Sequence, residues 1–473
     1  MQFTTFGFTC FFLAFLVLWH SLKDNITARK IVLIGGSSFF YGVNSLLWLV
    51  DLFGIAIFTW VINSCIENSN KQSIKKAWGI FGVSALLIHL VFWKYVPWGV
   101  LSWNEIDSLP QGWTITPPEW LLPVGLSFFT FHALSLIVPV WVNNYQKFSL
   151  SSTIAHISFF PSLLAGPVLR YNDIEPRWKQ SWSLKDIDWV SGIGRIMLGM
   201  TFKWVFSAKV AEWSDNTFSG MNDNVWDTLG GIHAYTLQIF FDFAGYSHMA
   251  IGLAILLGWK LPENFTQPYL STSIQEFWRS WHRSLSFFFK DNVYILLLGG
   301  NRKGKSQTLL NGFLTMLLSG IWHGANLTFV IWGAWHGVLL VIQSLYKMLF
   351  KFTLPKFVAW LITFEMVTIG WVWFRATDYD NAIQVFTALF NLKDYSLDSL
   401  TMQLSSFVWI AIMSAFIFYE KEMLTLLEGV KQKLNEDKSF RITFGGACLL
   451  SVWSGLIIFF GPVGVPAFIY NAF

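Results

Sequence analysis

The longest uncharged stretch of this sequence is the feature that most constrains its fold. Residues 306–346, 41 in all, contain no Asp, Glu, Lys or Arg, whereas about 20 apolar residues suffice for a helix to cross a bilayer. Over the whole chain 54% of residues are hydrophobic and 13% are charged, against about a quarter charged in soluble domains. The sequence therefore excludes a water-soluble globule. It predicts an all-α polytopic membrane protein, because helices satisfy their own backbone hydrogen bonds in lipid.

The charges between the first uncharged runs predict an orientation. These runs are residues 1–22, 31–50, 52–66 and 77–93. The first and third connections carry several Lys or Arg residues, whereas the second carries only Asp51. Basic connections are expected to face the cytoplasm, which places the N-terminus outside. Residues 1–22 lack a basic leader and an obvious cleavage site, so we expect a first span rather than a signal peptide.

Two later segments are predicted to depart from simple spanning helices. Residues 148–169 are apolar but contain Pro161 and the pair Gly166-Pro167, which favours a broken, re-entrant segment buried in protein. Residues 170–188 are charged and rich in Trp, which is typical of an interfacial stretch.

The 306–346 run predicts two helices separated by a break at residues 322–326. Fifteen helical residues before the break rise only about 22 Å, short of a ~30 Å hydrocarbon core, so His323 is expected inside the membrane. Further spans are predicted in residues 120–146, 229–259, 357–374, 405–419 and 443–473. The total is about 11–13 membrane segments in one domain, 1–473, without an internal repeat.

Several functional classes are disfavoured by the sequence. The net charge of +4 is distributed in short clusters between apolar runs, so we expect no nucleic-acid partner. Cys10, Cys65 and Cys448 lie far apart, and neither a disulfide nor a metal site is expected. Residues 299–306, GGNRKGKS, match a phosphate-loop pattern. The parallel sheet that such a loop needs has no room here, so a basic cytoplasmic hairpin is the better interpretation.

Two histidines and one acid stand out as candidate functional groups. His282 lies in a dense cluster of Trp, Arg and Glu, and His323 lies at the glycine-flanked break of the longest uncharged run. Ionisable groups at membrane depth are functional candidates by default, although buried histidines also join helices by hydrogen bonds. Asp242 interrupts an apolar run and must be paired, for which Arg279 or Arg195 are available.

Six motifs occur in a characteristic order. They are LPVGLSFFTFHALS (122–135), FFPSLLAGPVLRYNDI (159–174), FFDFAGYSHMAIGL (240–253), PENFTQPYLSTSIQEFWRSWHRSLS (262–286), YILLLGGNRKG (294–304) and SGIWHGANLTFVIWGAWHG (319–337). Together they resemble the membrane-bound O-acyltransferase family, most closely its bacterial polysaccharide branch. The resemblance extends over about residues 1–375, and the WRSWHRSLS and WHGAN motifs are its most specific parts.

The resemblance implies a fold, an activity and partners. The fold would surround a central funnel or tunnel in the bacterial cytoplasmic membrane. The activity would be transfer of an acetyl group from cytoplasmic acetyl-CoA, a substrate rather than a bound cofactor, to an extracytoplasmic acceptor. The acetyl group would serve O-acetylation of a cell-surface polysaccharide such as an alginate-like exopolysaccharide or peptidoglycan. Besides membrane lipids, an extracytoplasmic esterase-like transferase of the SGNH type is the expected partner.

The resemblance also implies site residues. His323 matches the active histidine of the family and His282 matches its second histidine. Supporting roles are expected around them for Trp278, Arg279, Trp281 and Asn326, with Asn326 holding His323 or the thioester oxygen. Arg302, Lys303 and Lys305 lie on the side where the CoA phosphates would be expected, although plain surface charge explains them at least as well on topology grounds. Pro139 and His248 depart from the Asp residues common in this branch.

Two other classes remain open from the sequence. A transporter or flippase would also contain an intramembrane acid and broken helices, but the chain shows no repeat. A lipid-linked sugar transferase would be expected to carry large charged outer loops, whereas the predicted outer loops are short.

Overall fold

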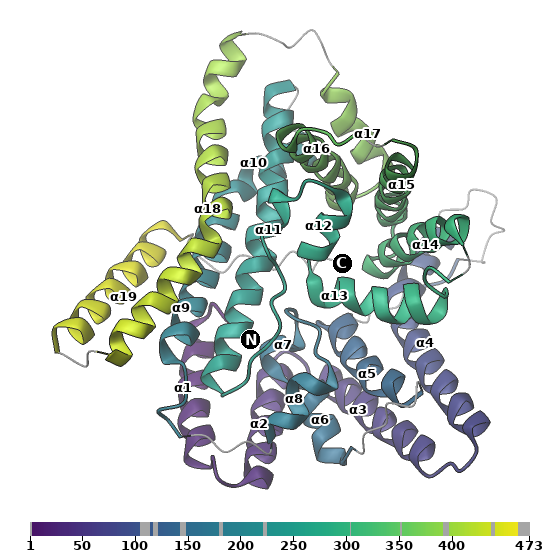
Figure 1. Ribbon diagram of the computed structural model, residues 1–473, viewed down its shortest axis with the longest axis vertical. Helices are drawn as coiled ribbons and strands as arrows, with labels where there is room; N and C mark the ends of the chain where they lie inside the picture. Colours follow the sequence, from purple (N-terminus) through teal and green to yellow (C-terminus); the bar gives the residue numbers. More distant parts are fainter. Residues whose placement is uncertain are drawn as a thin grey trace. The chain divides into compact units, whose positions relative to one another are not determined.

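The computed structural model is helical throughout the part of the chain that it describes (Figure 1). It describes residues 2–104, 114–116, 122–141, 148–178, 183–220, 225–302, 304–350, 352–390, 397–436 and 440–461. No strand occurs among these residues, which confirms the all-α prediction. The helices form two compact units, residues 1–193 with 249–262 and residues 194–248 with 263–473, and α9 and α11 contribute to both. The prediction of a single domain stays a prediction.

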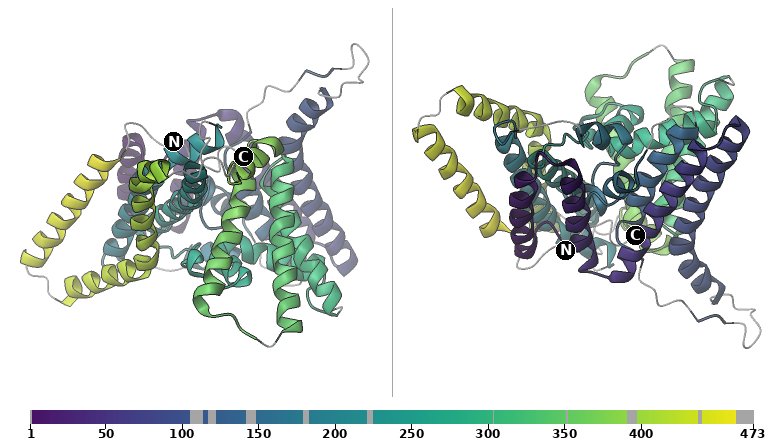
Figure 2. Two further views of the ribbon diagram at one scale, coloured as in Figure 1. Left: turned by 90° about the horizontal axis from the view of Figure 1, so that it is seen from above. Right: turned by 90° about the horizontal axis from the view of Figure 1, so that it is seen from below.

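The first unit contains the N-terminal helices. They are α1 (Phe6–Ser21), α2 (Ile26–Gly42), α3 (Leu46–Glu67), α4 (Gln72–Asn104), α5 (Leu126–Trp141), α6 (Leu150–Ile157), α7 (Phe160–Leu163), α8 (Tyr171–Trp178) and the start of α9 (Trp189–Met200). Helices α3, α4 and α5 pack side by side (Figure 2). Thr5, Asn25 and Ser45 cap the first three helices by accepting a backbone N–H, which satisfies donors that the first helical turn leaves unpaired.

One predicted boundary in this unit is wrong. Asp51 was expected in a connection between two spans, but it lies inside α3. Its Oδ1 is 2.8 Å from the His89 Nε2 of α4. An acid is tolerated within an apolar helix when a neighbouring helix supplies a polar partner. The real turn between α2 and α3 falls at residues 43–45, after Gly42.

The predicted broken segment is broken in the structure. Residues 148–169 form α6, the four-residue α7 and an irregular stretch. Neither helix is long enough to span a bilayer, and Gly166 has a φ of 102°, which a residue with a side chain rarely adopts. The predicted interfacial stretch begins with α8, and residues 179–182 of it lie outside the described part.

The second unit contains the remaining helices. They are η1 (Thr201–Ser207), α10 (Ala208–Phe218), α11 (Val225–Leu256), η2 (Pro268–Leu270), α12 (Ile274–Ser280), α13 (Arg283–Phe288), η3 (Phe289–Leu297), α14 (Lys305–His323), α15 (Leu327–Leu349), α16 (Lys356–Arg375), α17 (Tyr379–Ala388), α18 (Leu397–Glu436) and α19 (Phe440–Phe460). Helices η1 and η3 have π geometry and η2 is a 3₁₀ turn. The predicted break at residues 322–326 is confirmed, since α14 ends at His323 and α15 begins at Leu327.

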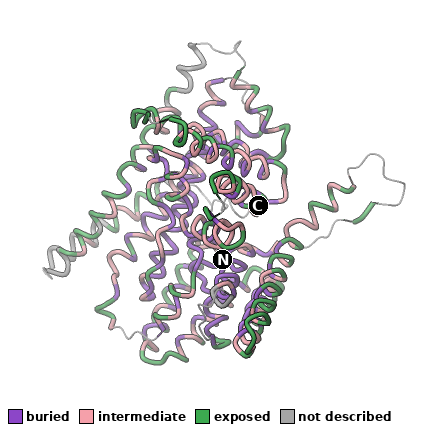
Figure 3. Tube along the Cα trace, turned by 45° about the vertical axis from the view of Figure 1, so that its right-hand side comes forward, coloured by how far each residue is buried: buried purple, intermediate pink, exposed green. Residues whose placement is uncertain are grey.

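Five helices in the described part are long and apolar enough to cross a membrane, namely α3, α4, α11, α15 and α16. Shorter apolar helices are Phe6–Ser21, Leu126–Val138 and Leu450–Phe459. Burial differs strongly among the long ones: 94% of the most apolar window of α11 is buried, but only 22% of that of α4 (Figure 3). Exposed apolar side chains on α4 suit contact with lipid. The total of 11–13 membrane segments stays a prediction.

Buried charges in the second unit pair differently from expectation. Asp242 of α11 was expected to pair with Arg279 or Arg195, but it forms an ion pair with Lys203 of η1. Arg195 instead donates to the Glu263 carboxylate at 2.8 Å and to His248 Nδ1 at 3.2 Å. Because arginine only donates, Nδ1 of His248 must accept, and its Nε2–H donates to Glu420 of α18 at 3.1 Å. His248 therefore connects α11 to the C-terminal helices.

Glycines allow α14 and α15 to pack unusually closely. A Cβ at Gly320 would lie 2.3 Å from the Phe329 carbonyl oxygen and 2.9 Å from the Gly333 Cα. These are backbone atoms of the facing helix, so a side chain there cannot be accommodated by a rotamer change. Small residues at helix interfaces permit this approach in membrane proteins. The contact fixes the end of α14, where His323 lies.

We predict that Gly320→Ala destabilises the protein by about 1–3 kcal/mol, the usual cost of overpacking. The added methyl group forces α14 away from α15. Thermal unfolding of the purified protein in detergent measures the effect. Gly429→Ala is the matched control, since a Cβ at Gly429 on α18 meets nothing within 4 Å. Equal unfolding temperatures for the two variants would contradict the close-packing argument.

Candidate functional site

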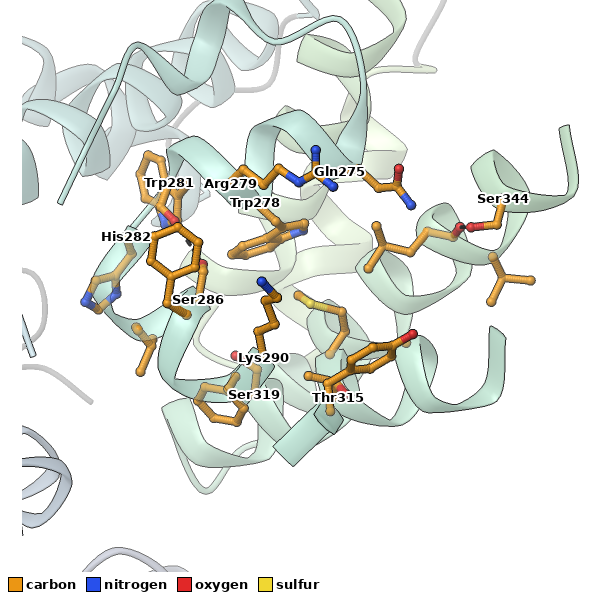
Figure 4. A pocket seen from close by; sticks show the side chains of 18 of the residues that line it. Gln275, Trp278, Arg279, Trp281, His282, Ser286, Lys290, Thr315, Ser319 and Ser344 are labelled. Atoms are coloured by element: carbon orange, nitrogen blue, oxygen red, sulfur yellow. Dashed lines mark hydrogen bonds between the residues drawn. The ribbon is translucent and has the colours of Figure 1, made fainter. Parts of the chain in front are cut away.

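Both predicted histidines line one cavity in the second unit. The cavity has a volume of about 420 Å³, within the usual range of small-molecule pockets. Residues of α12, α13 and η3 form one side, and residues of α14, α15 and α16 form the other. Figure 4 shows His282 and Ser344 at opposite ends of the drawn residues, with Trp278 and Lys290 between them. The structure therefore brings His282 and His323 to the same cavity from segments about 40 residues apart.

His323 reaches the cavity because of the helical period of α14. Gly312, Thr315, Ser319 and His323 all line it and recur at the three- and four-residue spacing of one helix face. The His323 side chain is 5% exposed. Its ring centroid lies 4.9 Å from that of Trp332 and 5.0 Å from that of Phe374, both edge to face. These contacts fix the imidazole at the end of α14, where Gly324 leaves the helical conformation.

His282 reaches the cavity on a sharp elbow between α12 and α13. Its φ is 40° and its ψ is 55°, the left-handed region that few residues with side chains adopt. The ring is edge to face with Phe243 of α11, with centroids 4.5 Å apart. Neither α12 nor α13 is a candidate span. Burial lowers the pKa of His282 to about 3, because desolvation disfavours the charged imidazole. The ring is therefore neutral near pH 7.

The aromatic wall of the cavity matches the prediction for Trp278 and Trp281, which both line it. Trp281 is 2% exposed, and its ring centroid lies 4.8 Å from that of Trp371. Behind this wall lies His336, which the sequence did not single out. Its ring is fully buried, 5.0 Å from Trp278 and 5.1 Å from Trp332 between centroids.

Several polar atoms of this wall are unsatisfied. Both ring nitrogens of His336 and the indole N–H groups of Trp278 and Trp332 are buried without a hydrogen-bond partner among the described residues. Buried polar groups are nearly always hydrogen-bonded in native proteins. The unpaired indole N–H of Trp278, which lines the cavity, is free to donate a hydrogen bond to a bound substrate.

The cations of the cavity agree with expectation for Arg279 but not for the basic residues expected at the CoA phosphates. Arg279 and Lys290 line it, whereas Arg302 and Lys305 do not. Lys303 lies outside the described residues. In Figure 4 the Lys290 amino group points toward Trp278 in the middle of the drawn residues. Lys290 belongs to the π-helix η3, a geometry that is common at functional sites. No periodic pattern of residues predicts this position of Lys290, because a π-helix shifts the side-chain register.

The phosphate-loop pattern has no phosphate-loop structure. The apolar run before it belongs to η3 rather than to a strand, and no strand occurs anywhere in the described ranges. This supports the rejection of a nucleotide-hydrolase site, which needs a strand before the loop. Asn301 and Tyr294 of this region line the cavity instead.

Asn326 and Asp242, two candidate site residues, form contacts away from the cavity. Asn326 caps α15, its Oδ1 accepting from the Thr328 N–H at 3.0 Å, while its Nδ2 donates to the Thr377 carbonyl at 2.6 Å. The amide thus anchors the start of α15, and the expected hydrogen bond to His323 or the thioester oxygen stays a prediction. Asp242 does not line the cavity, because Lys203 holds its carboxylate elsewhere.

The chemistry available to the cavity is proton transfer beside hydroxyl groups and cations. Ser286, Thr315 and Ser319 supply hydroxyls, and His282 and His323 supply imidazole nitrogens. Within the described ranges no group of three His, Cys, Asp or Glu side chains is placed to hold a metal ion. A neutral imidazole can accept a proton from an attacking hydroxyl, which is the requirement of general-base acyl transfer.

Comparison with known proteins adds independent information. The model of the MBOAT, membrane-bound O-acyltransferase, family matches residues 124–377, a range that contains every residue lining the cavity. The chain is 36% identical over 422 residues to the probable alginate O-acetylase AlgI of Pseudomonas aeruginosa, covering 87% of this chain and 80% of that protein.

Two further relatives act on other envelope polymers, according to their names. The peptidoglycan O-acetyltransferase of Helicobacter pylori is 31% identical over 433 residues, covering 84% of this chain and 80% of that protein. The teichoic acid D-alanyltransferase of Bacillus subtilis is 30% identical over 286 residues, covering 56% and 71%.

Proposed function

Because this chain belongs to the membrane-bound O-acyltransferase family, we propose that it transfers an acetyl group from acetyl-CoA toward a cell-surface polysaccharide. The observation that carries this proposal is the convergence of His282 and His323 on one cavity within the family-matched range. The names of the relatives support an O-acetylated polysaccharide as the final product, either alginate-like or peptidoglycan.

The reaction uses His323 as the general base. Its imidazole accepts the proton of an acceptor hydroxyl while that oxygen attacks the thioester carbonyl carbon. A carbon–oxygen bond forms and the carbon–sulfur bond breaks, and the departing CoA thiolate takes the proton back from the imidazolium. General-base catalysis of this kind contributes about 10²- to 10⁴-fold in rate. The aromatic contacts of His323 hold the base in one orientation.

His282 stabilises charge in the transition state. The attacked carbonyl oxygen becomes an oxyanion, and a neutral imidazole can donate its N–H to that oxygen. One such donor is typically worth about 10²- to 10³-fold in kcat. The elbow that carries His282 brings it to one end of the cavity (Figure 4), apart from the α14 face that carries His323. The two imidazoles thus take complementary roles, one as base and one as donor.

Lys290 and Arg279 bind an anionic part of the donor. Both cations line the cavity, and Figure 4 shows Lys290 between His282 and Ser344. Coenzyme A carries phosphates, which lysine and arginine recognise by charge-assisted hydrogen bonds. This role replaces the one expected for Arg302 and Lys305.

We predict that Lys290→Met raises the KM for acetyl-CoA about 10- to 100-fold, since a hydrogen bond to a charged group contributes about 1.5–3 kcal/mol. The kcat should change much less, because the contact forms equally in ground and transition states. Steady-state kinetics in proteoliposomes measure both constants. Arg302→Met is the control, a basic residue outside the cavity. A rise in KM for the acceptor instead of the donor would overturn the donor assignment.

The proposal also covers the side of the membrane on which the acceptor and the donor bind. The acceptor lies on the extracytoplasmic side of the bacterial cytoplasmic membrane, with the N-terminus outside, and the donor enters from the cytoplasm. An esterase-like partner of the SGNH type passes the acetyl group on to the polymer, because a site within a ~30 Å bilayer cannot travel along a polysaccharide.

Proteoliposomes containing the purified protein and ¹⁴C-acetyl-CoA on the cytoplasmic side test the proposal. We expect CoA release that depends on an added acceptor fraction from the cell envelope. A transporter or flippase would move substrate without releasing CoA. Absence of CoA release across several acyl donors and acceptor fractions would contradict the proposed reaction.

A further inference from the structure

The backbone of His282 is held in an unusual conformation, and something in the fold must maintain it. Only two residues with side chains have a positive φ in the described part, Gln267 and His282. A left-handed conformation brings Cβ too close to the following carbonyl oxygen, so it is unfavourable for such a residue. It persists only where the surroundings impose it, and such residues cluster at functional sites.

The extended segment before η2 binds the elbow on both sides of His282. The Thr266 N–H donates to the Ser280 carbonyl at 3.0 Å, and the Arg283 N–H donates to the Asn264 carbonyl at 2.8 Å. Residues 264–266 therefore run alongside residues 280–283 and bracket His282 between two backbone hydrogen bonds. Gly would adopt this φ without help, but the side chain of His282 requires the bracket.

The Asn264 side chain adds a second set of contacts. Its Oδ1 accepts from the Ser284 hydroxyl at 2.8 Å and lies 3.4 Å from the Ser284 N. Its Nδ2 donates to the Ser247 hydroxyl of α11 at 3.1 Å. Asn264 is fully buried, so water cannot replace its amide as the partner of these groups.

The same stretch of α11 also fixes the imidazole itself. Phe243 contacts the His282 ring and Ser247, four residues later on the same helix face, binds Asn264. Ring and backbone of His282 are thus positioned against one helix through two separate contacts. Asn264 is the residue that joins α11, the extended segment and the elbow.

We propose that Asn264 is a positioning residue for acyl transfer, which fixes His282 in its left-handed conformation and so holds its imidazole at the end of the cavity. This inference rests on the proposed function for its kinetic consequence only. Both ends of the amide are required, because Oδ1 accepts and Nδ2 donates. Asp supplies no donor at this position, and Ala supplies neither group.

Chemical accessibility of His282 tests the positioning without any activity assay. The purified protein is treated with diethyl pyrocarbonate, and carbethoxylation of each histidine is followed by peptide mass spectrometry. His282 is 1% exposed. We expect Asn264→Ala and Asn264→Asp to accelerate the modification of His282 at least about fivefold, because local opening exposes a buried group to solvent. The modification rate of His20 should not change. An unchanged rate at His282 would overturn the inference.

Kinetics test whether Asn264 acts through His282. A displacement of about 1 Å at a catalytic group can cost 10²-fold in rate, so we expect Asn264→Ala to lower kcat about 10²-fold and to change the KM for acetyl-CoA by less than about twofold. In the His282→Asn background the same substitution should change kcat by less than about twofold, because residues that act as a unit are not additive. Additive losses would contradict a role through His282.

Two further variants separate positioning from folding. Ser284→Ala removes one hydrogen bond of the set and should show the same pattern with smaller amplitude. Gln267→Ala is the matched control, since it alters the other left-handed residue of the same connection, whose side chain binds the Phe418 carbonyl of α18. It should leave His282 modification and kcat unchanged. If wild type transfers no acyl group, the proposed function fails, and the carbethoxylation result still decides the role of Asn264.

Discussion

Replacing His323 by alanine is expected to abolish acyl transfer, lowering kcat at least about 10³-fold, toward the upper end of what a general base contributes. No other side chain on the lining face of α14 can accept a proton at neutral pH, since Gly312, Thr315, Met316 and Ser319 are the neighbouring residues on that face. Water cannot replace the base efficiently in a wall of Trp332 and Phe374. The KM for acetyl-CoA should change little.

The measurement is CoA release under saturating acetyl-CoA, normalised to folded protein. His233→Ala is the control: His233 lies on α11, pairs with Glu365 at 3.3 Å and does not line the cavity. Its loss should leave kcat within about twofold, since it makes no contact that changes in the transition state. Persistent transfer by His323→Ala at more than a tenth of the wild-type rate would contradict its role as base.

The second large effect is expected at His282. Loss of an oxyanion donor lowers kcat about 10²- to 10³-fold and leaves ground-state binding nearly unchanged. The informative substitution is His282→Asn. Alanine would combine loss of the ring with strain at a φ of 40°, whereas Asn adopts the left-handed region more readily. The shorter Asn amide still cannot replace the imidazole N–H at the same point in the cavity.

Steady-state kinetics together with thermal unfolding separate the two contributions. His282→Asn should unfold within about 2 °C of wild type, since its backbone conformation is tolerated, while kcat falls as stated. If His282→Asn and His282→Ala lose activity only in proportion to lost stability, His282 is structural. A selective rise in the KM for donor or acceptor would assign it to binding instead.

Helices and their breaks were the most predictable part of this chain. The uncharged run 306–346 could only be two helices with an interruption, and α14 and α15 meet that expectation. Asp51 was misplaced because a charge count along one sequence cannot see that His89 of another helix lies 2.8 Å away. The partner of Asp242 was mispredicted for the same reason, because its ion pair with Lys203 of the π-helix η1 joins two different helices.

The sequence predicted the cavity residues that belong to recognisable motifs. It did not predict the residues whose place depends on contacts between distant segments. His282, His323, Trp278, Trp281 and Arg279 were singled out, and all line the cavity. Lys290, His336 and Asn264 were not, for different physical reasons. The π-helix η3 shifts the side-chain register at Lys290. His336 is fully buried and contacts the cavity only through the aromatic wall. Asn264 binds residues that are 17 to 20 positions away in the sequence.

The most direct test of the central claim follows isotopically labelled acetyl groups in cells that express wild type or His323→Ala. Mass spectrometry records CoA release from labelled acetyl-CoA in their membranes, and label in every envelope protein and polysaccharide. Label that reaches an envelope polymer in wild type and not in His323→Ala is the predicted result, and it identifies the acceptor. Equal labelling in both, or none with several acyl donors, would contradict His323-dependent acyl transfer and favour transport.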